Sequence, residues 1–256
     1  MKLVVLGSGT SVPHKHRSSS GYWLETSGGT VLLDCSASAA IRMAQENLDW
    51  PNLDTIWISH FHLDHCGGLA PFLAGMKHAA ATKDRRKPLL IFGAAGLKDL
   101  IVAFDAANNY RLLEQPFPVE IIEIDELETF EMLPGVEAVA LSTPHTAESH
   151  AIHIRDGDAT LVYSADTGFS KPLAAFANKV DLFILECSFF KDKPIEKHLE
   201  LAEAVYLIRK AKPKRAMLTH FYPEWDDVDF GVELKKFEPM CKVIEAVDGL
   251  RLTIPE

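Results

Sequence analysis

Four side chains that can bind metal ions stand within six positions of the sequence, in His60-Phe-His62-Leu-Asp64-His65. The motif directly follows a predicted strand over residues 55–59, and an extended chain turns His60 and His62 to the same side. Two imidazole nitrogens on one face suit a zinc-like cation. Asp64 and His65 lie past the turn, where they can aim at a second ion beside the first. The motif therefore predicts a metal centre.

Three later side chains are candidates to complete this centre, because each follows a predicted strand: His145, Asp166 and His220. A ligand at a strand-to-loop boundary is exposed yet rigidly held. A centre with two ions about 3.5 to 4 Å apart needs a bridging ligand in addition to the separate ligands of each ion. Position alone does not assign these three residues to particular ions, and taken singly each could be structural.

The elements that must position these residues begin with short strands bounded by glycines. Runs of β-branched, aromatic and aliphatic residues predict strands over residues 4–6, 22–25, 30–33 and 55–59. A helix is expected over about residues 38–47. Another helix follows the histidine motif, because Leu69, Phe72, Leu73 and Met76 recur at i, i+3, i+4 and i+7. The motif thus stands at the carboxyl end of a strand, where α/β sheets place their chemistry.

The rest of the chain repeats this order of strands, ligand-bearing loops and helices. Strands are predicted over residues 89–92, 119–124, 136–141, 150–154, 160–163, 182–185 and 216–219, and helices over about 172–178 and 195–210. The acidic stretch Asp125, Glu126, Glu128 and Glu131 is expected to be a solvated loop. Two sheets, each with helices on its outer face, account for this order.

Composition indicates a single α/β domain over residues 1–256. The chain is 47% apolar and 24% charged, so it can bury a large core without disulfides. Its net charge of -10 repels polyanions and counts against general nucleic-acid binding. Two basic clusters are expected to be solvated loops: Lys83, Arg85, Arg86 and Lys87, and Lys15, His16 and Arg17.

Cysteine usage and the first residues predict a cytoplasmic location. The four cysteines, Cys35, Cys66, Cys187 and Cys241, form no C-x-x-C pair and are typical of buried, reduced thiols. The first apolar run ends at Gly7, which makes it too short for a signal peptide or a membrane span. We therefore expect no membrane partner.

The ligand order resembles the metallo-β-lactamase superfamily, whose motifs are H-x-H-x-D-H, a later His, a later Asp and a final His. All seven positions are present, and the resemblance spans essentially the whole chain. It implies a single-domain, four-layer αββα sandwich with two ions, usually Zn²⁺, or alternatively Mn²⁺ or another divalent metal. Diiron flavoproteins have a Glu where His62 stands, so His62 favours hydrolysis over redox chemistry. Matching positions imply His60, His62 and His145 on one ion, Asp64, His65 and His220 on the other, and Asp166 as the bridge.

A narrower resemblance is to the ribonuclease Z group, which carries out tRNA 3′ processing. It is carried by Gly7-Ser-Gly-Thr-Ser-Val-Pro13, Leu32-Leu-Asp34-Cys, Glu186-Cys-Ser-Phe, His198-Leu-Glu200 and His220-Phe-Tyr-Pro223. The resemblance implies that His198 protonates the leaving alkoxide while Glu186 orients it. An imidazole with a pKa near 6.5 suits that transfer, and Asp64 can take a proton from the nucleophile. A homodimer is also implied.

Two features depart from that group. Its usual His-Ser-Thr and Glu-Ala-Thr loops read His198-Leu-Glu200 and Glu186-Cys-Ser188 here. Bacterial tRNA-processing members insert a long arm between the third metal histidine and the bridging aspartate, whereas His145 and Asp166 are only 21 positions apart. With the negative net charge, this favours a small or single-stranded phosphodiester over a structured tRNA.

The leading interpretation is a zinc-dependent phosphodiesterase of the ribonuclease Z-like group. Hydrolysis of a carboxylic ester, lactone or β-lactam is an alternative, because it uses the same dinuclear site, although it has no need of a proton donor such as His198. A genuine tRNA 3′ endonuclease is a further alternative. A non-catalytic metal-binding domain is disfavoured because all seven ligands are intact.

Overall fold

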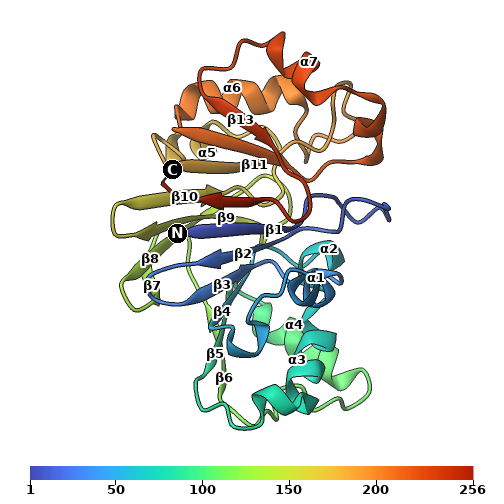
Figure 1. The fold of residues 1–256 in the computed structure, drawn as a ribbon, viewed down its shortest axis with the longest axis vertical. Helices are drawn as coiled ribbons and strands as arrows, with labels where there is room; N and C mark the ends of the chain where they lie inside the picture. The colour runs from blue at the N-terminus through green and yellow to red at the C-terminus, as the bar shows by residue number, and fades with distance from the viewer. Residues whose placement is uncertain (256) are drawn as a thin grey trace.

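Two seven-stranded sheets pack face to face in the computed structural model, which describes residues 1–255 (Figure 1). The first sheet has the order β14 (Arg251–Thr253), β1 (Lys2–Gly7), β2 (Gly21–Glu25), β3 (Thr30–Leu33), β4 (Thr55–Ile58), β5 (Leu89–Gly93) and β6 (Val119–Glu123). The second has the order β13 (Lys242–Glu245), β12 (Arg215–Thr219), β11 (Leu182–Glu186), β10 (Ala159–Tyr163), β9 (His150–Asp156), β8 (Val136–Ser142) and β7 (Thr129–Leu133).

Each sheet has an antiparallel part and a parallel part. Strands β14, β1, β2 and β3 pair antiparallel, whereas β3, β4, β5 and β6 pair parallel. Likewise β7 to β10 pair antiparallel and β10 to β13 pair parallel. Parallel neighbours need crossover connections, so the helices cluster there. The chain therefore builds the same arrangement twice.

The helices cover the outer faces of the two sheets (Figure 1). Those of the first sheet are α1 (Ala39–Gln45), α2 (Leu63–Cys66), α3 (Leu69–His78) and α4 (Leu97–Ala106), and those of the second are α5 (Lys171–Phe176), α6 (Leu201–Ala211) and α7 (Phe230–Lys235). Single 3₁₀ turns lie at Trp50–Asn52, Ala80–Thr82 and Pro223–Asp227. The expected αββα sandwich is confirmed.

Strand alternation divides the apolar residues of the first sheet between two cores. Val4 and Leu6 face α1 and α3, whose buried residues include Met43, Phe72 and Met76. The residues in between face the second sheet: Leu3 and Val5 join a cluster with Ala138, Ile152 and Phe183. All four cysteines are free, and three of them are buried. None of the helices within residues 1–255 has both the length and the apolarity to cross a bilayer.

The acidic stretch is a solvated loop at Asp125, Glu126 and Glu128, as its charge predicted, but the expectation is wrong for Glu131. Glu131 lies in β7, which pairs with β8. The strand forms because its other face is apolar: Met132 is fully buried, and the ring of Phe130 stacks on Trp57 and Phe92. Polar and apolar residues that alternate along β7 therefore form an edge strand with one solvent-exposed face.

The helix expected over residues 195–210 begins later, at Leu201. Two tertiary features fix this start. Glu200 and Glu203 form a reciprocal capping box, and Glu200 forms a β-bridge with Phe189. Residues 195–200 therefore approach the helix as an irregular segment, and this segment carries His198.

Candidate metal centre

The candidate ligands stand where four strands end at one rim of the sandwich. His60 and His62 follow β4, and Asp64 and His65 lie in the short helix α2 directly after them. His145 follows β8, Asp166 follows β10, and His220 follows β12. Segments up to 160 positions apart in sequence thus converge at one place, as expected for the carboxyl ends of strands.

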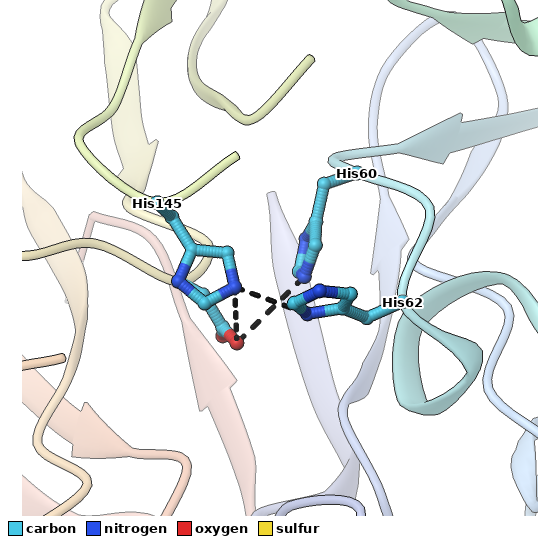
Figure 2. A group of neighbouring side chains, drawn as sticks. His60, His62 and His145 are labelled. Atoms are coloured by element: carbon cyan, nitrogen blue, oxygen red, sulfur yellow. Dashed lines mark hydrogen bonds and ion pairs between the residues drawn. The ribbon is translucent and has the colours of Figure 1, made fainter. Parts of the chain in front are cut away.

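One group of ligands consists of His60, His62, His145 and Asp166, whose ligand atoms all lie within 4.8 Å of one another. His145 reaches in from the side opposite His60 and His62 (Figure 2). Its Nε2 atom lies 3.0 Å from Nδ1 of His62 and 3.6 Å from Oδ2 of Asp166. The Oδ2 atom also lies 3.7 Å from Nε2 of His60.

A second group consists of Asp64, His65 and His220, again within 4.8 Å of one another. The Oδ1 atom of Asp166 faces this group, 3.2 Å from Nε2 of His65 and 3.3 Å from Nε2 of His220. Asp166 therefore presents one carboxylate oxygen to each group. This is the geometry of a bridging ligand between two cations.

Several ligand atoms have the environment that a cation would satisfy. Among the described residues, the buried Nε2 atoms of His60, His65 and His220 and the Oδ1 atom of Asp166 have no hydrogen-bond partner. Buried polar atoms are rarely left unpaired, and four in one cluster call for a common partner. A mixed set of imidazoles and carboxylates suits Zn²⁺ and similar divalent ions. The residues present thus fit a metal centre.

The ionisation of His60, His145 and Asp166 also favours cation binding. Burial, with neighbouring His65, lowers the pKa of His60 to about 2. Burial likewise lowers the pKa of His145. Burial opposes ionisation of Asp166, but the neighbouring His220 and His65 hold its pKa well below the usual range. Neutral imidazoles and an ionised carboxylate are the forms that bind metals.

Asp34 supports the second group, a role that the sequence did not reveal. Its carboxylate, fully buried after β3, accepts hydrogen bonds from Nδ1 of His65 at 2.7 Å and from the hydroxyl of Tyr163 at 2.6 Å. It also accepts from the amide and the hydroxyl of Ser59. Because Nδ1 of His65 donates to Asp34, its Nε2 is left free to bind a cation.

His198 lies beside the centre, in the irregular segment before α6, and is buried. Its Nδ1 atom is 2.8 Å from Oε1 of Glu186, a buried carboxylate at the end of β11. Burial alone would lower the pKa of His198, but the hydrogen bond and charge of Glu186 outweigh it, so that pKa is raised. One nitrogen of His198, one oxygen of Asp166 and one nitrogen of His220 lie within 4.8 Å of one another.

Asp64 is ionised in this setting. Burial opposes ionisation of Asp64, but Nε2 of His220, at 3.5 Å from Oδ2 of Asp64, and the neighbouring His65 lower the pKa of Asp64 below its usual value. The structure thus brings together all nine residues that the sequence marked for the site: His60, His62, Asp64, His65, His145, Asp166, Glu186, His198 and His220.

A comparison with known proteins now identifies the family. The sequence profile described as "Anti-Pycsar protein Apyc1" matches residues 1–240. The chain belongs to the Apyc1 family. This Apyc1-family chain is also similar to the Ribonuclease Z of Methanosarcina acetivorans, with 25% identity covering 100% of the chain and 98% of the relative.

Solved structures share the fold of this Apyc1-family chain. The metallo-beta-lactamase fold protein YhfI from Bacillus subtilis superposes with a TM-score of 0.79 and 23% identity, covering 98% of each chain. Human tRNase Z, short form, has a TM-score of 0.76 and 20% identity, covering 100% of each chain. The resemblance to the metallo-β-lactamase superfamily and its ribonuclease Z group is confirmed. The Apyc1-family chain is a metallo-hydrolase of the ribonuclease Z-like group.

The basic clusters of the Apyc1-family chain are mostly exposed, as expected, but several of their cations make internal contacts. Arg85 is buried and donates hydrogen bonds to four backbone carbonyls, so the expectation of a solvated loop is wrong for this residue. Lys87 pairs with Asp54. Arg17 pairs with Asp226, at 2.6 Å. One cation of each cluster is therefore paired with a carboxylate within the protein.

Proposed function

We propose that this protein is a zinc-dependent phosphodiesterase that acts on a small or single-stranded phosphodiester. The observation that carries the proposal is the buried His198–Glu186 pair beside two ligand groups that share Asp166. Expulsion of an alkoxide needs a proton, and His198 stands where a donor would be required. The name of the related Ribonuclease Z, an enzyme of RNA phosphodiesters, supports the same class of substrate.

In this proposal two Zn²⁺ ions, or two ions of Mn²⁺ or another divalent metal, would occupy the two groups. His60, His62 and His145 would hold one ion, Asp64, His65 and His220 would hold the other, and Asp166 would serve both. Bound ions would activate the attacking water and offset the negative charge of the phosphodiester.

The protein's own side chains move the protons. The water oxygen forms a bond to phosphorus as the bond from phosphorus to the leaving oxygen breaks. Asp64 takes the proton that the water loses. Nε2 of His198 gives its proton to the leaving alkoxide, while Glu186 stabilises the protonated ring through Nδ1.

Comparing substrate classes tests this proposal. The zinc-loaded protein should hydrolyse phosphodiesters faster than phosphomonoesters, lactones or β-lactams. Elemental analysis should find two zinc ions per chain. A preference for lactones or carboxylic esters would instead support the alternative hydrolase, and one ion or fewer at saturating zinc would contradict the dinuclear centre.

Two expectations about partners belong to the same proposal. Structured tRNA should be a poor substrate, since His145 and Asp166 are 21 positions apart and the residues between them hold only β9, β10 and their connections. The homodimer implied by the family resemblance stays a prediction, which the mass of the protein in solution would test.

A further inference from the structure

Residues 188–199, here called the His198 segment, connect β11 to the start of α6. Backbone hydrogen bonds close the two ends of the segment onto each other: the amide of Phe189 donates to the carbonyl of Leu199, and the amide of Leu201 donates to the carbonyl of Phe189, both at 3.1 Å. The amide of Leu199 also donates to Oε2 of Glu186 at 3.0 Å. The segment is therefore a closed loop anchored beside the catalytic pair.

The same segment orients one histidine of each ligand group. Nδ1 of His145 donates to the carbonyl of Lys197 at 3.0 Å, which leaves its Nε2 free for a cation. At the other end, the hydroxyl of Ser188 lies 2.9 Å from Nδ1 of His220 and 2.7 Å from Oε2 of Glu186. The hydroxyl can accept from His220 while it donates to Glu186. The position of the segment thus affects both ligand groups as well as His198.

Lys193 holds the middle of the segment in place. Its ammonium lies 2.9 Å from Oε1 of Glu203 in α6, 3.1 Å from Oε2 of Glu196, and 3.2 Å from the carbonyl of His198, to which it donates. Only 9% of the Lys193 side chain is exposed, whereas the side chain of Glu196 is 90% exposed. The pair with Glu203 and the bond to His198 therefore carry most of the interaction, since solvent screens the pair with Glu196.

The far side of the segment packs tightly on the loop that carries Asp166. A Cβ atom placed on Gly168 would lie 2.4 Å from the carbonyl oxygen of Glu196, and the amide of Gly168 bonds to the carbonyl of Pro144. The segment thus lies between α6 and the loops of two ligands. A shift of its middle would be transmitted to His198 and to the carbonyl of Lys197.

We propose that Lys193 is a positioning residue, whose ammonium fixes the His198 segment so that His198 meets the leaving group and the segment orients His145 and His220. For His198 the inference rests on the proposed function. For the two ligands it rests on the geometry of the metal centre alone. Loss of a hydrogen bond that orients a metal ligand, such as those of His145 and His220 to this segment, typically lowers metal affinity or activity by about 10- to 100-fold.

The experiment compares Lys193→Met with Lys191→Met, which removes the ammonium of an exposed lysine of the same segment. Three quantities are measured: zinc retained against a chelator, hydrogen exchange of the Phe189 and Leu199 amides, and kcat on aliphatic and nitrophenyl phosphodiesters. In Lys193→Met we expect about 10- to 100-fold weaker zinc retention, faster exchange of both amides, and a larger loss of kcat on the aliphatic ester. Lys191→Met should match the wild type in all three.

A milder pair of variants keeps the test decisive if Lys193→Met fails to fold. Glu203→Gln preserves the capping box, in which Gln serves as well as Glu, but weakens the partner of Lys193. It should show the same changes to a smaller degree, and Glu196→Gln should show none.

Unchanged zinc retention and an unchanged ratio of the two kcat values in folded Lys193→Met or Glu203→Gln would overturn the inference, even if the thermal midpoint fell. If the wild type cleaved no phosphodiester at all, the proposed function would fail by itself. Zinc retention and amide exchange would still decide the role of Lys193.

Discussion

Replacing His198 by Ala should slow the hydrolysis of poor leaving groups without removing metal. A general acid typically contributes about 10² to 10⁴ in rate, or about 2.7 to 5.5 kcal/mol in the barrier. His198 meets the conditions for a contribution in that range, because it is 7% exposed and Glu186 raises its pKa. More of it is therefore protonated at neutral pH than of a free imidazole. We expect kcat on an aliphatic phosphodiester to fall by about 10² to 10⁴.

Comparing two leaving groups distinguishes the loss of a proton donor from a general disturbance of the active site. A nitrophenolate hardly needs the proton, so the loss of kcat on a nitrophenyl phosphodiester should be much smaller. His153→Ala is the matched control, because His153 lies in β9 and its ring contacts Phe176, away from the ligand groups. It should leave both rates close to those of the wild type.

The variant should remain folded. Glu186 would lose one donor but keep the amides of Thr167 and Leu199 and the hydroxyl of Ser188. A lost buried hydrogen bond of this kind costs about 1 to 3 kcal/mol, and each kcal/mol lowers Tm by about 2 to 4 °C in a chain of this size. The measurement is kcat on both esters at 25 °C, with zinc analysis of the same sample. Equal losses on both esters, or loss of zinc, would refute His198 as the proton donor.

Four further predictions concern the metals, pH and tRNA. Asp166→Ala should release more zinc than His62→Ala, since a bridging carboxylate serves both ions; equal retention in elemental analysis would show that the bridge is misassigned. Because the folded pKa of His198 lies above 6.5, kcat on the aliphatic ester should fall as the pH rises through that folded pKa, and kcat on the nitrophenyl ester should not. Because the folded pKa of His198 is raised, the stability that the His198–Glu186 pair adds is fully present below pH 6.5 and is lost as the pH rises through that folded pKa. The difference in unfolding free energy between the wild type and His198→Ala should therefore shrink over that range. Finally, kcat/KM on precursor tRNA should be no better than on a short single-stranded oligonucleotide. Position-specific cutting of tRNA, with activity that falls steeply between about 50 and 200 mM salt, would contradict this prediction.

The positions of the candidate ligands in the fold could be predicted from the sequence because each one follows a strong local signal. The residues before His60 and His220 are β-branched and aliphatic, and these runs form β4 and β12 as expected. A polar residue that ends such a run must lie at the rim of a sheet. Local patterns were therefore sufficient to place the ligands, even though they come from distant parts of the chain.

The supporting contacts could not be predicted, because they join residues that no local pattern relates. Asp34 is a single acid after β3, and only the fold brings it to His65 and Tyr163. The start of α6 shows the same limit. Helical periodicity continues back from Leu201, but the bridge between Phe189 and Glu200 ends the helix there. Helix α4 was also missed, as were strands β13 and β14, which are short and partly polar.

These supporting contacts explain how two sheets can share one metal centre. His60, His62, Asp64 and His65 belong to the first sheet, whereas His145, Asp166 and His220 belong to the second. Two buried hydrogen bonds cross between the sheets beside the site: the hydroxyl of Tyr163 in β10 donates to Asp34, and the hydroxyl of Tyr22 in β2 lies 2.6 Å from that of Thr219 in β12. Apolar packing alone sets the spacing of two sheets loosely, whereas directional bonds fix their register. Because Asp34 also orients His65, and Thr219 directly precedes His220, the contacts that align the sheets also align the two halves of the metal centre.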